Sequence, residues 1–147
     1  MVLGIDLCKT FAQISIYNRK ENTVDTPQLF TCDNSCNIPS MVCKKKGLDE
    51  WHVGDEAKRL ELLSEGVVVD DIVNKAVNGE VIIVDNVTVT GDELMYHFIR
   101  GLIGLVCDIS QVEYVTVCFE DFCMSLLESV RKAFTASSSV TATYSAR

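Results

Sequence analysis

Apolar and polar residues alternate near the start of the chain in a way that predicts paired strands. Val2–Asp6 is an apolar run that ends on an acid, and Phe11–Tyr17 places apolar side chains at every second position. A period of two residues is typical of half-buried strands. The short segment Leu7–Thr10 joins the two runs, which predicts a tight turn. Val24–Phe30 predicts a third, weaker strand, in which Pro27 favours an edge position.

The middle of the chain predicts small strands and short helices. Acidic residues at 55 and 56 suit the positive N-terminal end of a helix, and Gly66 suits its stop. Residues 31–37 predict a loop. The predicted elements are strands over Met41–Lys45, Trp51–Val53 and Val67–Val69, a helix from Gly54 to about Glu65, a helical turn over Asp70–Val77, and a hairpin formed by Val81–Val84 and Val87–Val89.

The clearest local signal is the start of a long helix. Thr90 and Glu93 have the Thr-x-x-Glu spacing of a capping box, in which each side chain bonds the other residue's backbone N–H. The pattern predicts a helix from Gly91 to about Val106. Apolar side chains at helical spacing form its expected buried stripe, and they are Leu94, Phe98, Leu102 and Leu105.

The last third of the chain predicts one more strand and one more helix. Glu113–Phe119 alternates as a strand does, and a helix is expected from Glu120 to about Phe134. The buried face of that helix is expected to hold Phe122, Leu126, Val130 and Phe134. Thr135–Arg147 is rich in Ser, Thr and Ala without a helical stripe, which predicts a polar tail or a truncation end.

Composition and charge exclude several classes of partner. The net charge of −8 argues against binding to a nucleic-acid backbone, which requires clustered Lys and Arg. The only basic run, Lys44–Lys46, is expected to be a solvated hairpin turn. No apolar run is long enough to span a membrane, and no signal peptide is visible. Seven cysteines without a secretion signal predict reduced thiols and a cytoplasmic protein.

Three motifs in this order resemble a known superfamily. Gly4–Thr10 (GIDLCKT) resembles its first phosphate motif, Gly-Ile-Asp-Leu-Gly-Thr-Thr. Ile38–Val42 with Trp51–Lys58 is similar to Thr-Pro-Ser-Tyr-Val and Ile-Gly-Asp-Ala-Ala-Lys, and Val115–Val117 is similar to its Val-Thr-Val-Pro strand. The chain therefore resembles the N-terminal lobe of the actin-like ATPase superfamily, with heat-shock chaperones of the 70-kDa class the most similar.

The resemblance implies both a fold and a ligand. The implied fold is α/β, a mixed sheet flanked by helices in a ribonuclease H-like lobe with a small inserted α+β part, over residues 1–134. The implied cofactors are ATP and Mg²⁺. Asp6 would hold the metal through water, since Mg²⁺ keeps most of its waters. Cys8, Lys9 and Thr10 would lie against phosphate. From the residues alone, Asp6 could equally cap a turn.

Departures from the family pattern limit the expected activity. Cys8 stands where the family places a Gly that lets phosphate approach the backbone. Ile72 aligns with the chaperones' catalytic Lys, and Lys75 lies three residues further on. No second, Gly-rich phosphate motif occurs. We therefore expect a truncated, pseudo-ATPase lobe that binds nucleotide without hydrolysing it alone. Its partner would be a missing second lobe or an unknown protein. The alternative is a non-enzymatic interaction or scaffold module that has lost the phosphate site.

Other reactive side chains carry weaker hypotheses. Zinc could be bound by three cysteines and a histidine, although the cysteine spacing is wider than in common structural sites. These candidate ligands are Cys32, Cys36, Cys43 and His52. His97 is expected to be a helix-surface or core histidine rather than a catalytic base. Cys118 and Cys123 flank a strand–helix turn, but no paired His is suggested, so we expect structural thiols.

Overall fold

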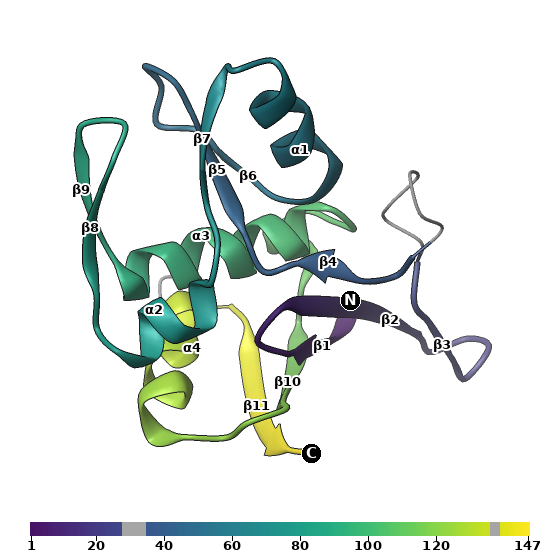
Figure 1. Cartoon of the computed structure of the whole chain (residues 1–147). Coiled ribbons are helices and arrows are strands. Elements are labelled where there is room, and N and C mark those ends of the chain that lie inside the picture. The colour runs from purple at the N-terminus through teal and green to yellow at the C-terminus, as the bar shows by residue number, and fades with distance from the viewer. Residues whose placement is uncertain (28–34, 136–138) are drawn as a thin grey trace.

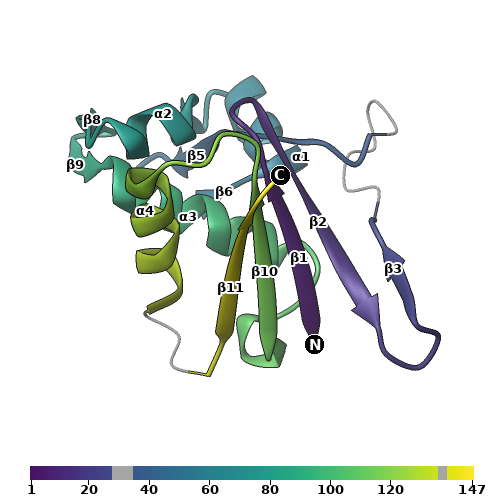
Figure 2. The ribbon, with the colours of Figure 1, turned by 90° about the horizontal axis from the view of Figure 1, so that it is seen from below.

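A mixed sheet forms the larger part of the fold. The computed structural model describes residues 1–27, 35–135 and 139–147. The strand order is β11-β10-β1-β2-β3, and β4 also pairs with β2 (Figure 2). The strands β1, β10 and β11 are parallel, whereas β2 runs antiparallel to β1, β3 and β4. Their bounds are β1 Val2–Leu7, β2 Phe11–Asn18, β3 Thr23–Asp25, β4 Ile38–Pro39, β10 Tyr114–Phe119 and β11 Thr141–Ala146.

One face of this sheet is buried beneath helices. In β1 the side chains of Leu3, Ile5 and Leu7 are buried, while the positions between them are partly exposed. β10 repeats the alternation. The long helix α3 (Gly91–Gly104) contacts α4 (Met124–Thr135), and both contribute to the same apolar core as the sheet. The expected α/β class, with a mixed sheet flanked by helices, is confirmed.

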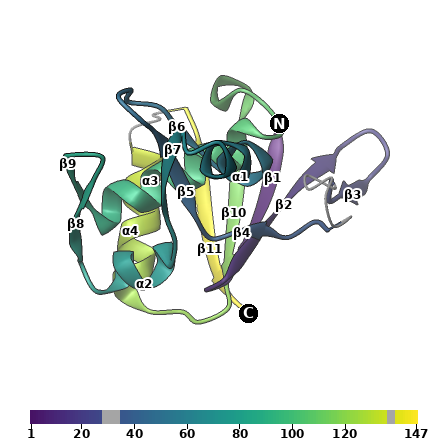
Figure 3. The same ribbon diagram turned by 45° about the horizontal axis from the view of Figure 1, so that its top comes forward.

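The inserted part lies between β4 and α3. It contains a three-stranded sheet, two short helices and a hairpin (Figure 1). Its elements are β5 Val42–Lys45, β6 Trp51–His52, α1 Gly54–Leu62, β7 Gly66–Val69, α2 Ile72–Val77, β8 Val81–Val84 and β9 Val87–Thr90. Figure 3 shows the β8–β9 hairpin standing away from the main sheet. These elements match the small strands, helices and hairpin predicted from the sequence.

A partly buried ion pair connects the hairpin to the inserted sheet. Lys44 is 4% exposed, and its ammonium lies 2.7 Å from the carboxylate of Asp85 in the β8–β9 turn. The same carboxylate accepts the Gly47 N–H at 2.9 Å. The Lys44 bond, followed by the Gly47 bond, lowers the pKa of Asp85. The expectation of a solvated basic turn is therefore wrong for Lys44, because its charge is compensated inside the fold.

The capping box of α3 is confirmed. The Thr90 hydroxyl accepts the Glu93 N–H at 3.2 Å, and the Glu93 carboxylate accepts the Thr90 N–H at 2.8 Å. The helix ends at Gly104, two residues before the predicted end, and is followed by the short 3-10 helix η1 (Ile109–Gln111). Its predicted stripe is buried at Leu94, Phe98 and Leu102 and partly buried at Leu105.

Several predicted boundaries are wrong. α1 ends at Leu62 instead of Glu65, and α4 begins at Met124 instead of Glu120. Phe122 therefore precedes α4 and is 47% exposed, not part of its buried face. β3 covers only Thr23–Asp25, and residues 28–30 of the predicted third strand lie outside the described residues.

The expected tail contains a sixth strand of the main sheet. β11 pairs with β10 in parallel, with Thr143 opposite Thr116. Their hydroxyls lie 2.9 Å apart and share a hydrogen bond. The strand lies at the sheet edge and carries small polar residues on its open side, so it lacks the apolar alternation that identified the others. The sequence predicted a polar tail or a truncation end over Thr135–Arg147, and within it Thr141–Ala146 forms this strand.

Candidate functional site

The predicted phosphate motif forms a tight turn at the carboxyl end of β1. Cys8 N–H donates to the Phe11 carbonyl at 3.0 Å, which closes the turn. Ser40, which directly follows β4, supports the turn, because its N–H donates to the Thr10 carbonyl at 3.0 Å and its hydroxyl donates to the Cys8 carbonyl at 3.3 Å. Cys8, Lys9 and Thr10 all have ordinary negative φ angles. A cysteine therefore fits this turn without backbone strain.

Asp6 lies where the parallel strands end together. The register places Asp6 beside Cys118 of β10, and Cys118 beside Ser145 of β11. One carboxylate oxygen, Oδ2, accepts a hydrogen bond from the Arg147 guanidinium. The other, Oδ1, is buried and has no hydrogen-bond partner among the described residues. Asp6, Cys118 and Arg147 line a cavity of about 380 Å³ on the open face of the sheet.

This arrangement fits a Mg²⁺ ion held through water better than a protein-built metal cage. The described residues contain no group of three His, Cys, Asp or Glu side chains placed to hold a metal ion. Mg²⁺ needs no such group, because it commonly binds proteins through one or two carboxylates and keeps its waters. The free Oδ1 of Asp6 is an acceptor of the kind that a metal-bound water requires.

Lys9 carries the positive charge of the turn. Its ammonium lies 3.0 Å from the Asp121 carboxylate, and its backbone N–H donates to Glu120 Oε2 at 3.3 Å. The bond to Asp121 raises the pKa of Lys9, with smaller contributions from Glu120 and Asp71. Lys9 is thus a persistent cation at neutral pH. Thr10 lies beside it with an exposed side chain.

Cys8 points inward and is chemically quiet. It is 1% exposed, and burial raises the pKa of its thiol, helped by the negative charges of Asp6 and Glu120. Because the thiolate is the reactive form, a raised pKa slows attack on electrophiles.

We expect Cys8 to react with iodoacetamide at pH 7.5 much more slowly than the partly exposed Cys36. Cys43 offers an internal comparison, since burial also raises its pKa. Peptide mass spectrometry after timed labelling measures all three rates. Labelling of Cys8 as fast as Cys36 in folded protein would contradict the buried, protonated state described here.

The residue expected to align with the catalytic lysine of heat-shock chaperones is apolar. Ile72 is fully buried in the core. Lys75 turns back to the start of α2, where its ammonium donates to the Asp70 carbonyl at 2.9 Å. It therefore interacts with the backbone before α2 in this conformation. These two positions are part of the reason why we expect catalysis to be impaired.

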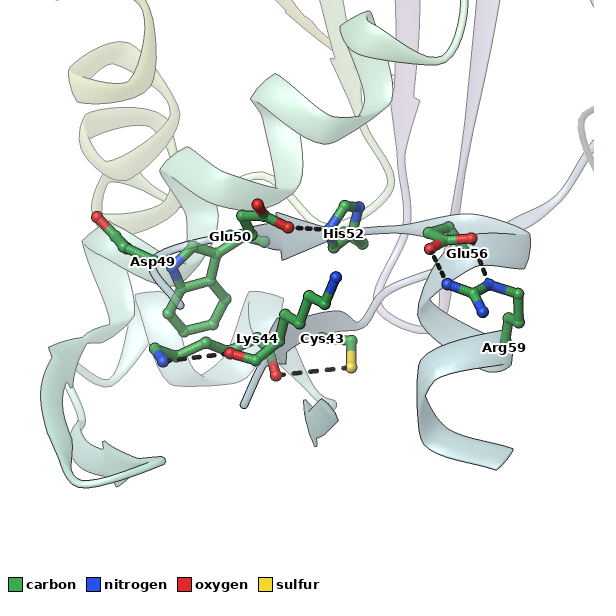
Figure 4. A network of polar contacts seen from close by, with 9 residues as sticks. Cys43, Lys44, Asp49, Glu50, His52, Glu56 and Arg59 are labelled. Carbon is green, nitrogen blue, oxygen red and sulfur yellow. Dashed lines mark hydrogen bonds and ion pairs between the residues drawn. The ribbon is translucent and has the colours of Figure 1, made fainter. Parts of the chain in front are cut away.

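The zinc hypothesis finds no support in the described part of the chain. Cys32 lies outside the described residues. Cys43 and His52 are opposite each other on β5 and β6, but each has another contact (Figure 4). The Cys43 thiol lies 4.0 Å from the Lys44 carbonyl, and His52 Nε2 lies 3.6 Å from Glu50.

A second cavity was not foreseen from the sequence. It measures about 580 Å³ and lies between β6 and α3. Trp51 stacks on His97 with ring centroids 4.4 Å apart, and Tyr96 meets His97 edge-on at 5.4 Å. Burial lowers the pKa of His97, which keeps its ring neutral at pH 7. His97 is thus a packing residue of an aromatic cluster.

Residues 23–142 match a family of unknown function (DUF5716), C-terminal. The chain belongs to this family. The family match begins inside β3, so β1, β2 and the turn between them precede it. A search of curated proteins finds no match.

Solved structures reveal the fold relationship. Among 48 matching chains is a non-polymerising mutant of MamK bound to AMPPNP, with a TM-score of 0.59 and 14% sequence identity. The match covers 97% of this chain and 40% of the MamK chain. The actin-like fold expected from the sequence is confirmed. At this identity the likeness shows the fold alone, and this chain spans less than half of its structural relative.

No described helix is both long and apolar enough to cross a bilayer.

Proposed function

We propose that this chain binds the phosphate end of a Mg²⁺-nucleotide at the β1–β2 turn (Leu7–Thr10), as one half of a two-sided cleft. The observation that carries the proposal is the buried, unpaired Oδ1 of Asp6 at the carboxyl end of β1. The actin-like fold and the AMPPNP bound by its structural relative support the same ligand class. The likeness to heat-shock chaperones belongs to this proposal and rests on the sequence motifs.

Asp6 and three residues of the turn each have a role in this proposal. Asp6 would accept hydrogen bonds from water molecules bound to Mg²⁺. The Mg²⁺ ion would neutralise part of the negative charge of the phosphates. Lys9 would meet phosphate as a mobile point charge, since an ammonium needs no fixed approach direction. Thr10 would offer its hydroxyl. Cys8, buried beside Asp6 and Glu120, would help to fix the turn.

Hydrolysis by this chain alone is not part of the proposal. Phosphoryl transfer depends on several groups that position water and stabilise charge around the transferred phosphate. The lysine position of the chaperones is occupied by Ile72 in the core. The chain would therefore act by holding nucleotide and reporting it to a second lobe or partner.

The second candidate is an interaction module without a ligand. It is favoured by the charge pairs at the turn, where Arg147 contacts Asp6 and Asp121 contacts Lys9. Charged side chains that already pair with one another need no ligand to compensate their charges. In that case the fold would present a docking surface to a protein partner, and added nucleotide would change nothing.

Calorimetry separates the two candidates. Titration of AMPPNP into the chain should release or absorb heat only when Mg²⁺ is present. Asp6→Asn should weaken that binding by about tenfold or more, the effect of losing one charged contact. The matched control is Asp25→Asn, which alters an exposed acid on β3 of the same sheet. Absence of heat at millimolar nucleotide would refute binding and leave the interaction module.

A further inference from the structure

The charged side chains beside the β1–β2 turn already have partners within the protein. The Asp6 carboxylate holds the Arg147 guanidinium. The Lys9 ammonium lies 3.0 Å from the Asp121 carboxylate, and the Lys9 backbone N–H donates a hydrogen bond to Glu120 Oε2 at 3.3 Å. The partners come from four segments: β1, the β1–β2 turn, the β10–α4 loop and the residue that follows β11.

We infer that these side chains are built-in substitutes for the ligand, with Arg147 in the place of the cation and Glu120 and Asp121 in the place of phosphate oxygens. This inference rests on the proposed function and adds its regulation. Binding is then an exchange, in which Mg²⁺ releases Arg147 from Asp6 and phosphate releases the two acids from Lys9. The unliganded site is closed by its own charges.

The backbone around these side chains is fixed, so the exchange needs only rotamer changes. Arg147 N–H donates to the Phe119 carbonyl at 3.0 Å, and Glu120 N–H donates to the Leu7 carbonyl at 3.2 Å. The side chains themselves are accessible, since Arg147 is 52% exposed and Asp121 is 67% exposed. Exposed ion pairs are weak and exchange readily. The closed state is therefore a modest barrier that a ligand can overcome.

The charge balance explains why both parts of the ligand are needed. Two cations, Lys9 and Arg147, face three acids, Asp6, Glu120 and Asp121. A nucleotide without metal would bring further negative charge to a region that already has an excess. Mg²⁺ alone would displace Arg147 but leave the acids on Lys9. In the Mg²⁺–nucleotide complex, the metal replaces Arg147 at Asp6 and the phosphate replaces the acids at Lys9. The site therefore prefers the metal-bound nucleotide to the free anion.

The test removes the internal substitutes one at a time. Arg147→Gln should bind Mg²⁺–AMPPNP, and Mg²⁺ alone, roughly two- to fivefold more tightly than the unmodified chain, which is the effect of one exposed ion pair. Asp121→Asn should tighten the nucleotide complex by a similar factor and leave the affinity for Mg²⁺ alone unchanged. Calorimetry with each probe measures both affinities.

Matched controls remove surface pairs of the same kind elsewhere. Arg59→Gln breaks the pair with Glu56 on α1, and Glu128→Gln breaks the pair with Arg131 on α4. Neither should change either affinity. Circular dichroism checks that every variant is folded.

The outcomes separate this inference from the function beneath it. Mg²⁺-dependent binding that needs Asp6 but is unchanged in Arg147→Gln and Asp121→Asn would overturn the internal substitutes alone. Weaker binding in Arg147→Gln would also overturn them, because Arg147 would then be a ligand contact. No binding in any variant would overturn the proposed function itself.

Discussion

Gly91→Ala is expected to destabilise the fold more than the same exchange at Gly101 or Gly104, the other glycines of α3. A Cβ at Gly91 would lie 2.3 Å from the Lys75 carbonyl oxygen and 2.8 Å from the Ala76 Cα. Both neighbours are backbone atoms of α2, which cannot rotate away as a side chain could. Overpacking of this kind costs about 3 kcal/mol. Relief would require α2 to move away from the start of α3.

Gly104→Ala is the matched control for this prediction. Gly104 ends the same helix, but a Cβ there would meet nothing within 4 Å. Alanine favours helix over glycine by up to about 1 kcal/mol, so this variant should be neutral or slightly more stable. Urea unfolding of both variants, followed by circular dichroism, gives the two free energies. Equal stabilities of the two variants would contradict the close packing of α2 against α3.

Phe98→Ala should cost a similar or larger amount of stability. Phe98 is fully buried in the centre of α3, in the core cluster that also contains the inward residues of β1 and β10. Truncation of a buried phenylalanine removes its transfer free energy and leaves a cavity, which together cost about 3–5 kcal/mol. For a chain of this length the melting temperature should fall by roughly 10 °C.

Phe122→Ala provides the comparison at a position of the same residue type. Phe122 is 47% exposed and meets Phe119 edge-on with ring centroids 5.8 Å apart. Its truncation should cost about 1 kcal/mol or less, since only one aromatic contact is lost. Thermal melts of the two variants test the difference. A larger loss for Phe122 than for Phe98 would mean that the core is centred elsewhere.

The elements that could be predicted from the sequence are those whose own residues specify them. The capping box at Thr90 and the apolar stripe of α3 are local signals, and the structure reproduces both. β1 and β10 alternate because helices bury one of their faces. Such periodic burial is visible along the chain without knowledge of neighbouring elements.

The missed elements depend on tertiary pairing. β11 is stabilised by its ladder with β10 and carries mainly small polar residues, so its sequence resembles a linker. The helix α4 begins at Met124, later than the sequence predicts, although the acids Glu120 and Asp121 would suit a helix N-terminus. In the structure both acids interact with Lys9, and the helix begins after them.

Only the part of the candidate site that lies close together in the sequence was predicted. Asp6, Lys9 and Thr10 are adjacent in the sequence, so the turn that they form could be anticipated. The residues that complete the site lie far along the chain, because Glu120, Asp121 and Arg147 reach it only through the parallel pairing of β1, β10 and β11. No periodic pattern in the sequence indicates that these distant residues come together. The fold was needed to find them.

The most direct test of the central claim is an amide NMR titration of the labelled chain with Mg²⁺–AMPPNP. We predict that the largest shifts fall on Asp6–Thr10 and on residues 118–121, and that they require Mg²⁺. Shifts concentrated instead at Trp51 and His97, or an unchanged spectrum at millimolar ligand, would contradict a nucleotide site at the β1–β2 turn.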